Sequence, residues 1–156
     1  MKHLALIAIL LTTPAVAATP TVNPLSKEPF YAAIVRDAGT LKARTMRMAQ
    51  SPSLTLLTSA GFKTYAREIS TLSERNLKGH LDLKARGTDN DLKCVLKGVS
   101  LDLPRKLAAI EAAKTPDALK GALNDMAYLL EDNIEVIVTP ATADSGLDCV
   151  IEFGNS

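Results

Sequence analysis

The sequence contains few of the residues that usually build catalytic or metal sites. Its 156 residues include two histidines, two cysteines and no tryptophan, and aromatic residues make up only 4%. One histidine, His3, lies in a segment that we expect to be removed, so His80 would be the only imidazole of the mature chain. A multi-histidine metal site is therefore excluded, and so is a Ser-His or Cys-His pair without His80. We expect no metal and no cofactor.

Sequence motifs for nucleophilic or phosphate chemistry are also missing, since G-x-S-x-G, S-x-x-K and a glycine-rich phosphate loop do not occur. The best enzymatic candidate is the acidic group Glu131, Asp132 and Glu135. Glu131 and Glu135 would share one helical face, and a carboxylate pair can perform acid–base chemistry on a glycan. A solvated helix end explains the same residues, so we expect no catalytic residue. A cell-envelope hydrolase is the alternative.

The N-terminus has the three parts of a secretory signal peptide. Lys2 gives a positive start, Leu4–Leu11 is apolar, and Ala15-Val16-Ala17 is a small-residue cleavage motif. An apolar run of eight residues is too short for a bilayer, which needs about 20. We therefore expect cleavage after residue 17, a flexible lead-in over 18–28 and a single helical domain over 29–156. The expected location is periplasmic or secreted.

The cysteines predict a disulfide bond between Cys94 and Cys149, because an exported chain folds in an oxidising compartment. They lack the C-x-x-C spacing that usually tunes a redox pair. The bond would close a loop of 55 residues. A loop of this length is worth about 4 kcal/mol in the chain-entropy model.

Charge is unevenly distributed along the chain. Residues 18–90 carry 11 basic and 6 acidic side chains, whereas 91–156 carry 6 basic and 11 acidic ones. If the first two helices pair, Arg44, Arg47, Lys63 and Arg67 could form a patch for an anionic partner. The alternative explanation of this charge distribution is that the two halves pack together and their charges are solvated, without any partner.

The clearest element is a helix over 115–132, in which apolar residues recur from Leu119 to Leu130 at helical spacing. Thr115 is the expected N-cap and Pro116 suits the first turn. A first helix is expected over 29–48, and Ser51-Pro52-Ser53 breaks it. A second helix buries four residues at heptad-like spacing: Phe62, Tyr65, Ile69 and Leu72. Gly79 is its expected C-terminal cap.

Two segments are ambiguous between helix and strand. Residues 80–99 fit a β-hairpin or a helix capped by Asp91, and we favour the helix, followed by another short helix from Pro104. The β-branched run 134–138 could pair with 149–153 as a short hairpin, or it could prolong the preceding helix. No internal repeat or second domain is evident.

The sequence therefore predicts a mainly α fold, a bundle of about four to five helices, either with or without a short C-terminal β-hairpin. The alternative is an α+β fold with hairpins at 80–99 and 134–153. The expected function is a non-catalytic binding, adaptor or inhibitor protein of the cell envelope. Its partner would be another envelope protein or an anionic envelope component, not nucleic acid. A third possibility is a carrier that holds an apolar ligand between its helices.

Overall fold

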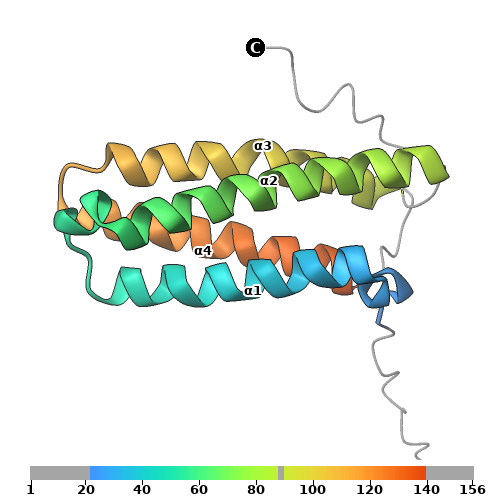
Figure 1. Cartoon of the computed structure of the whole chain (residues 1–156), viewed down its shortest axis with the longest axis horizontal. Coiled ribbons are helices and arrows are strands. Elements are labelled where there is room, and N and C mark those ends of the chain that lie inside the picture. The colour runs from blue at the N-terminus through green and yellow to red at the C-terminus, as the bar shows by residue number, and fades with distance from the viewer. Residues whose placement is uncertain (1–21, 88–89, 140–156) are drawn as a thin grey trace, which may run out of the picture.

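The computed structural model describes residues 22–87 and 90–139, which form a four-helix bundle (Figure 1). The helices are α1 (Pro29–Gln50), α2 (Ala60–Arg86), α3 (Asn90–Ala112) and α4 (Pro116–Val138). Two short 3₁₀ helices precede α1 and α2, namely η1 (Pro24–Lys27) and η2 (Leu54–Thr58). Within the described ranges there is no strand. The prediction of a mainly α bundle is confirmed.

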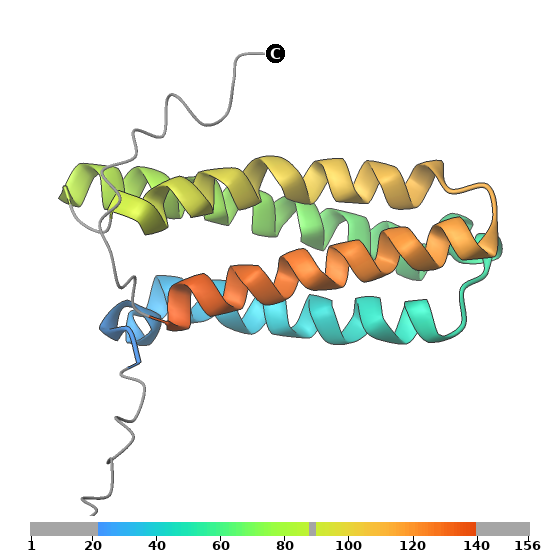
Figure 2. The ribbon, with the colours of Figure 1, turned by 180° about the vertical axis from the view of Figure 1, so that it is seen from behind.

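Each helix runs antiparallel to the one before it, so the bundle has up-down-up-down topology (Figures 1 and 2). In Figure 2, α4 lies between α1 and α3 at the front of the molecule. The α1–α4 and α2–α3 pairs are packed most extensively, and among neighbouring helices α1 and α2 are packed least. The α1–α2 side is therefore the most open face of the bundle.

Local sequence explains where the helices begin and end. Thr115 accepts a hydrogen bond from the Ala118 amide at 3.2 Å, as the sequence predicts. Ser59 caps α2, and its hydroxyl accepts from the Phe62 amide at 3.0 Å. At the other end of α2, Gly87 adopts φ 67°, a left-handed conformation that glycine tolerates well.

The prediction that Gly79 ends α2 is wrong, because the helix continues for seven more residues to Arg86. Gly79 is instead a point of close approach, where an added Cβ would lie 3.1 Å from Leu96 and 3.4 Å from Tyr31. The hairpin considered at 80–99 is also excluded, because α2 and α3 contain most of that segment. Residues 134–138 continue α4, which rules out the first strand of the other hairpin.

The prediction that a separate helix begins at Pro104 is wrong. Pro104 lies inside α3. Proline has no amide hydrogen, so the carbonyl of Ser100, four residues earlier, loses its helical donor. The Ser73 hydroxyl of α2 donates to this carbonyl at 2.6 Å. A side chain of the neighbouring helix thus replaces the missing hydrogen bond, and α3 passes through the proline without ending.

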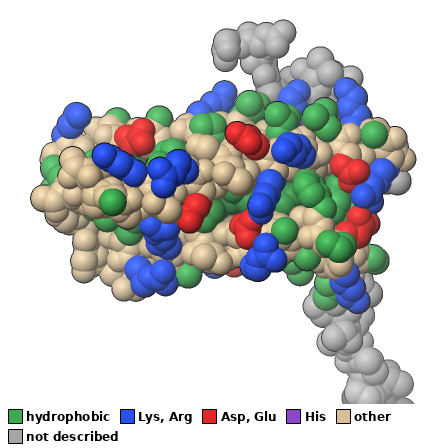
Figure 3. All heavy atoms as spheres, in the orientation of Figure 1, with side chains coloured by type: hydrophobic (Ala, Val, Ile, Leu, Met, Phe, Trp, Pro, Cys, Tyr) green, Lys and Arg blue, Asp and Glu red, His purple; other side chains and the backbone are tan. Residues whose placement is uncertain are grey.

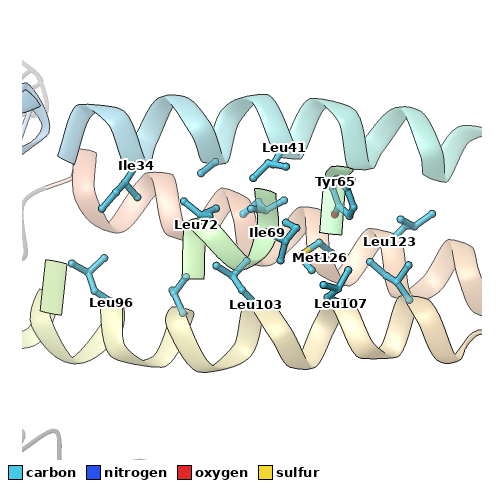
Figure 4. Close-up of a cluster of buried hydrophobic side chains, with 14 of the residues drawn as sticks. Ile34, Leu41, Tyr65, Ile69, Leu72, Leu96, Leu103, Leu107, Leu123 and Met126 are labelled. Atoms are coloured by element: carbon cyan, nitrogen blue, oxygen red, sulfur yellow. The ribbon is translucent and has the colours of Figure 1, made fainter. Parts of the chain in front are cut away.

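Apolar side chains from all four helices fill the core (Figure 4). The four residues predicted to form the inner face of α2, Phe62, Tyr65, Ile69 and Leu72, are all buried. On α4 the predicted stripe is buried at Leu119, Leu123, Met126 and Leu130. Burying each such side chain contributes about 1.5–3 kcal/mol. This burial is the main stabilising term of a bundle without tryptophan.

A pair of asparagine side chains lies within the core. The side-chain amides of Asn76 on α2 and Asn133 on α4 are fully buried and donate to each other, at 3.0 and 2.7 Å. Asn76 also donates to the Leu72 carbonyl at 2.9 Å. These two helices lie diagonally across the bundle, so the pair fixes their relative register.

The ends of the described chain meet. The Asn23 amide donates to the Val138 carbonyl at 2.8 Å, and the Asn23 side chain caps η1. Pro24–Lys27, in the segment expected to be a flexible lead-in, forms η1. The predicted signal peptide, Cys149 and the segment 149–153 lie outside the described residues. Among the described helices, none combines the length and apolar composition needed to cross a membrane.

Candidate functional site: the groove between α1 and α2

Polar contacts hold the lightly packed α1–α2 side together, and we call this line of contacts the α1–α2 seam. Three ion pairs cross it: Glu28 with Arg86 at 2.9 Å, Asp37 with Arg75, and Arg44 with Glu68 at 2.8 Å. The α1 residue number rises as the α2 number falls, as an antiparallel pair requires. Figure 3 shows basic and acidic side chains side by side along this face.

A groove of about 320 Å³ opens in the middle of the seam. Its lining is Asp37, Thr40, Leu41 and Arg44 from α1, and Glu68, Thr71, Leu72 and Arg75 from α2. The two leucines are buried and form its apolar base. The two threonines stand exposed on its walls, and each donates its hydroxyl hydrogen to the carbonyl four residues earlier at 3.0 Å. Their oxygens can still accept hydrogen bonds.

The two walls carry the same sequence pattern, an acidic residue followed by x-x-Thr-Leu-x-x-Arg. The α1 copy is Asp37–Arg44, D-A-G-T-L-K-A-R, and the α2 copy is Glu68–Arg75, E-I-S-T-L-S-E-R. Because the helices are antiparallel, the acid of each copy pairs with the arginine of the other. The groove thus has a local pseudo-two-fold symmetry.

Arg44 is anchored more firmly than the other groove arginine. Besides Glu68, it donates to the Gly61 carbonyl at 2.5 Å, and its guanidinium lies 5.6 Å from the centroid of the Tyr65 ring. Tyr65 is buried, and its hydroxyl lies 2.8 Å from that of Thr45. Burial raises the pKa of Tyr65 to about 12, although the Thr45 hydrogen bond and the Arg44 charge act in the opposite direction. The phenol is therefore neutral and structural.

Binding is the chemistry that this groove can support. It provides two guanidinium groups, two carboxylates and two hydroxyl oxygens above an apolar base, and its formal charge is zero. No group of three or more His, Cys, Asp or Glu in the described part of the chain could hold a metal ion. The residues that line the groove include no thiol or imidazole, and both threonine hydroxyls donate to backbone carbonyls.

The structure places the four residues of the predicted anionic-partner patch at adjoining ends of α1 and α2. Arg44 is engaged in the groove, as described above. Arg47, Lys63 and Arg67 are exposed, and none of them forms an ion pair with a described residue. We call these three residues the basic end. Among the charged side chains at this end of the molecule, on the left in Figure 3, Lys and Arg outnumber Asp and Glu.

Two apolar residues lie at the same end of the bundle. Met46, next to Arg47, is 47% exposed, and Leu54 of η2 is 37% exposed. Met46 also lines a second pocket, of about 240 Å³, together with Lys120 of α4. Apolar side chains therefore lie at the same end of the bundle as the three cations of the basic end.

The acidic group of the enzymatic alternative lies on α4, away from the groove. Glu131 and Glu135 are four residues apart on a continuous helix, and Glu131 forms an ion pair with Lys42 of α1. Burial, followed by the charge of Glu131, raises the pKa of Asp132. The ion pair with Lys42 gives Glu131 a structural explanation.

The lone histidine has a structural position as well. His80 is buried inside α2, with its Nδ1 2.8 Å from the Lys93 carbonyl of α3. A carbonyl only accepts, so Nδ1 carries the hydrogen in this contact. The ring therefore links α2 to α3.

The comparisons with known proteins identify no relative. No known protein family matches the sequence, and searches of curated proteins and of solved structures find no significant match.

Proposed function

We propose that this protein is a non-catalytic, exported binding protein that holds an anionic component of the cell envelope at its basic end. One observation carries the proposal: Arg47, Lys63 and Arg67 are exposed and form no ion pair with a described residue, whereas the other five arginines all form one. Arg67 donates to the Thr64 hydroxyl at 3.1 Å, but no ion pair has to break before the three cations attract an anion. The exposed Met46 and Leu54 add apolar contact area.

Export supports the same proposal. The signal-peptide pattern of residues 1–17 sends the chain to the compartment where anionic phospholipids and acidic glycans are exposed. A binding role also agrees with the absence of nucleophile motifs from the sequence.

The test is co-sedimentation with vesicles of phosphatidylglycerol and phosphatidylcholine, compared with vesicles of phosphatidylcholine alone. The variant Arg47→Gln/Lys63→Gln/Arg67→Gln should bind the anionic vesicles at least about tenfold more weakly, because each cation near such a surface contributes about 1 kcal/mol. It leaves all eight groove residues unchanged. An acidic polysaccharide in solution forms the second arm, which distinguishes a lipid from a glycan.

The matched control is Lys27→Gln/Lys78→Gln/Lys84→Gln, which removes the same charge from exposed sites on η1 and the second half of α2. The control should bind like the wild type. Equal weakening of both variants would reduce the effect to net charge and refute a site at the basic end. Failure of the wild type to bind either probe would refute the proposed partner.

A further inference from the structure

The groove has unused hydrogen-bonding capacity on its α2 wall. In contacts with described residues, Glu68 uses only Oε2, bound to Arg44, and Arg75 uses only Nη1, bound to Asp37. On the α1 wall, both carboxylate oxygens of Asp37 are occupied, by Arg36 and Arg75. Arg44 already holds two partners. A ligand would therefore find its free acceptor at Glu68 and its free donors at Arg75.

These two groups have opposite charges and a defined spacing. They lie seven residues apart on one helix, which corresponds to about 10 Å along the axis. The whole groove has no net charge, so it does not favour an anion or a cation. It favours a molecule with one charge of each sign about 10 Å apart.

We propose that the groove binds a short, unblocked peptide in extended conformation, with its terminal ammonium at Glu68 and its carboxylate at Arg75. An extended chain advances 3.3–3.6 Å per residue, so about three residues span the distance. The Thr71 oxygen accepts from a peptide N–H in the middle, and small side chains rest on Leu41 and Leu72. A volume of about 320 Å³ suits a ligand of this size.

The ion pairs of the groove do not block this site. Arg75 and Asp37 are each about one-third exposed, and Glu68 is half exposed, so the pairs are solvated and individually weak. A guanidinium has five N–H donors, and a peptide carboxylate can bind Arg75 while the contact with Asp37 remains. The peptide thus adds to the existing contacts.

The experiment is an NMR titration of the ¹⁵N-labelled protein with trialanine. Trialanine should shift amide signals of α1 and α2 around the groove. N-acetyl-trialanine and trialanine amide should each bind about tenfold more weakly, and the doubly blocked peptide more weakly still. Equal binding of the doubly blocked peptide, no binding of trialanine, or tighter binding of the dianion suberate would each overturn the proposal.

Two variants assign the ends of the peptide. Glu68→Gln should weaken trialanine but leave N-acetyl-trialanine unchanged, and Arg75→Gln should weaken trialanine but leave the amide unchanged. Lys106→Gln, which breaks a comparable pair with Asp125 between α3 and α4, is the control and should change nothing. If Glu68→Gln instead left binding of trialanine amide unchanged and Arg75→Gln left binding of N-acetyl-trialanine unchanged, the proposed orientation of the peptide would be contradicted. Vesicle binding at the basic end is measured separately, so loss of one activity does not imply loss of the other.

Discussion

The buried pair Asn76–Asn133 is the clearest case in which single side chains define this bundle. Both amides are fully buried, and each supplies the other with a donor and an acceptor. An apolar pair would carry no desolvation cost, but it would allow α2 and α4 to shift more easily along each other. We infer that the pair contributes more to register than to stability.

Truncating one of these residues should therefore be costly. Asn133→Ala leaves the buried Oδ1 of Asn76 without a donor, while its Nδ2 keeps the Leu72 carbonyl, and should lower the free energy of unfolding by about 2–3 kcal/mol. The double variant Asn76→Ala/Asn133→Ala should lose less than the sum of the two single variants, by about 1 kcal/mol or more, because it leaves no orphaned amide. Urea denaturation of the four proteins gives the coupling. Strict additivity would show that the two amides do not depend on each other.

The raised pKa of Tyr65 should make the stability of the protein depend on pH. Its pKa is about 12 in the folded protein and about 10 in an unfolded chain. The folded state therefore keeps a proton that the unfolded state loses, and stability should fall as pH rises from about 10 through about 12. The shift corresponds to about 2–3 kcal/mol. Tyr65→Phe should show a smaller fall in urea midpoint between pH 9 and pH 11 than the wild type, and identical falls would contradict this account.

At the scale of elements, the proline inside α3 depends on its neighbour. Ser73 donates to the Ser100 carbonyl that Pro104 leaves without its helical partner. Ser73→Ala should cost about 1–2 kcal/mol of unfolding free energy. In a Pro104→Ala background the backbone amide returns, so the same substitution should cost about 1 kcal/mol less. Chemical denaturation measures both, and an equal cost in the two backgrounds would show that the proline and the serine are unrelated.

Helix positions could be predicted from the sequence where the signal is local. The start of α1 at Pro29, the cap at Thr115 and the apolar faces of α2 and α4 follow from spacing and capping chemistry. Gly79 and Pro104 could not be interpreted correctly, because their roles depend on other helices: on Leu96 and Tyr31 in one case and on Ser73 in the other. A residue that usually ends a helix continues it when a neighbour compensates.

The groove shows the same limit. Its acid-x-x-Thr-Leu-x-x-Arg pattern is present twice in the sequence, and a search for matching helical faces would have found it. Its meaning requires the antiparallel register of α1 and α2, which brings each acid to the other copy's arginine. The basic patch was predicted by residue type, but only the structure separates the engaged Arg44 from the three exposed cations.

For the whole molecule, the predicted disulfide bond is an independent constraint. Cys94 is buried on α3, and Cys149 lies outside the described residues. If the two are bonded, thiol counting on denatured, non-reduced protein finds no free thiol, and reduction lowers the unfolding free energy by up to about 4 kcal/mol. Finding two free thiols in exported protein would contradict the bond.

The arrangement of charge over the molecule also separates its two proposed sites. The groove is neutral and its charges are paired, whereas the basic end carries three unpaired cations. Screening over a Debye length of about 8 Å at physiological ionic strength weakens a contact between exposed opposite charges. Binding at the basic end must therefore depend on salt.

The salt dependence of binding to phosphatidylglycerol vesicles is the most direct test of the proposed function. For the wild type, the association constant should fall steeply as sodium chloride rises from well below to well above physiological concentration. The Arg47→Gln/Lys63→Gln/Arg67→Gln variant should show weaker binding with a much shallower slope. Tight binding of the wild type that ignores salt, or the same slope in both proteins, would contradict the assignment of the basic end as the binding surface.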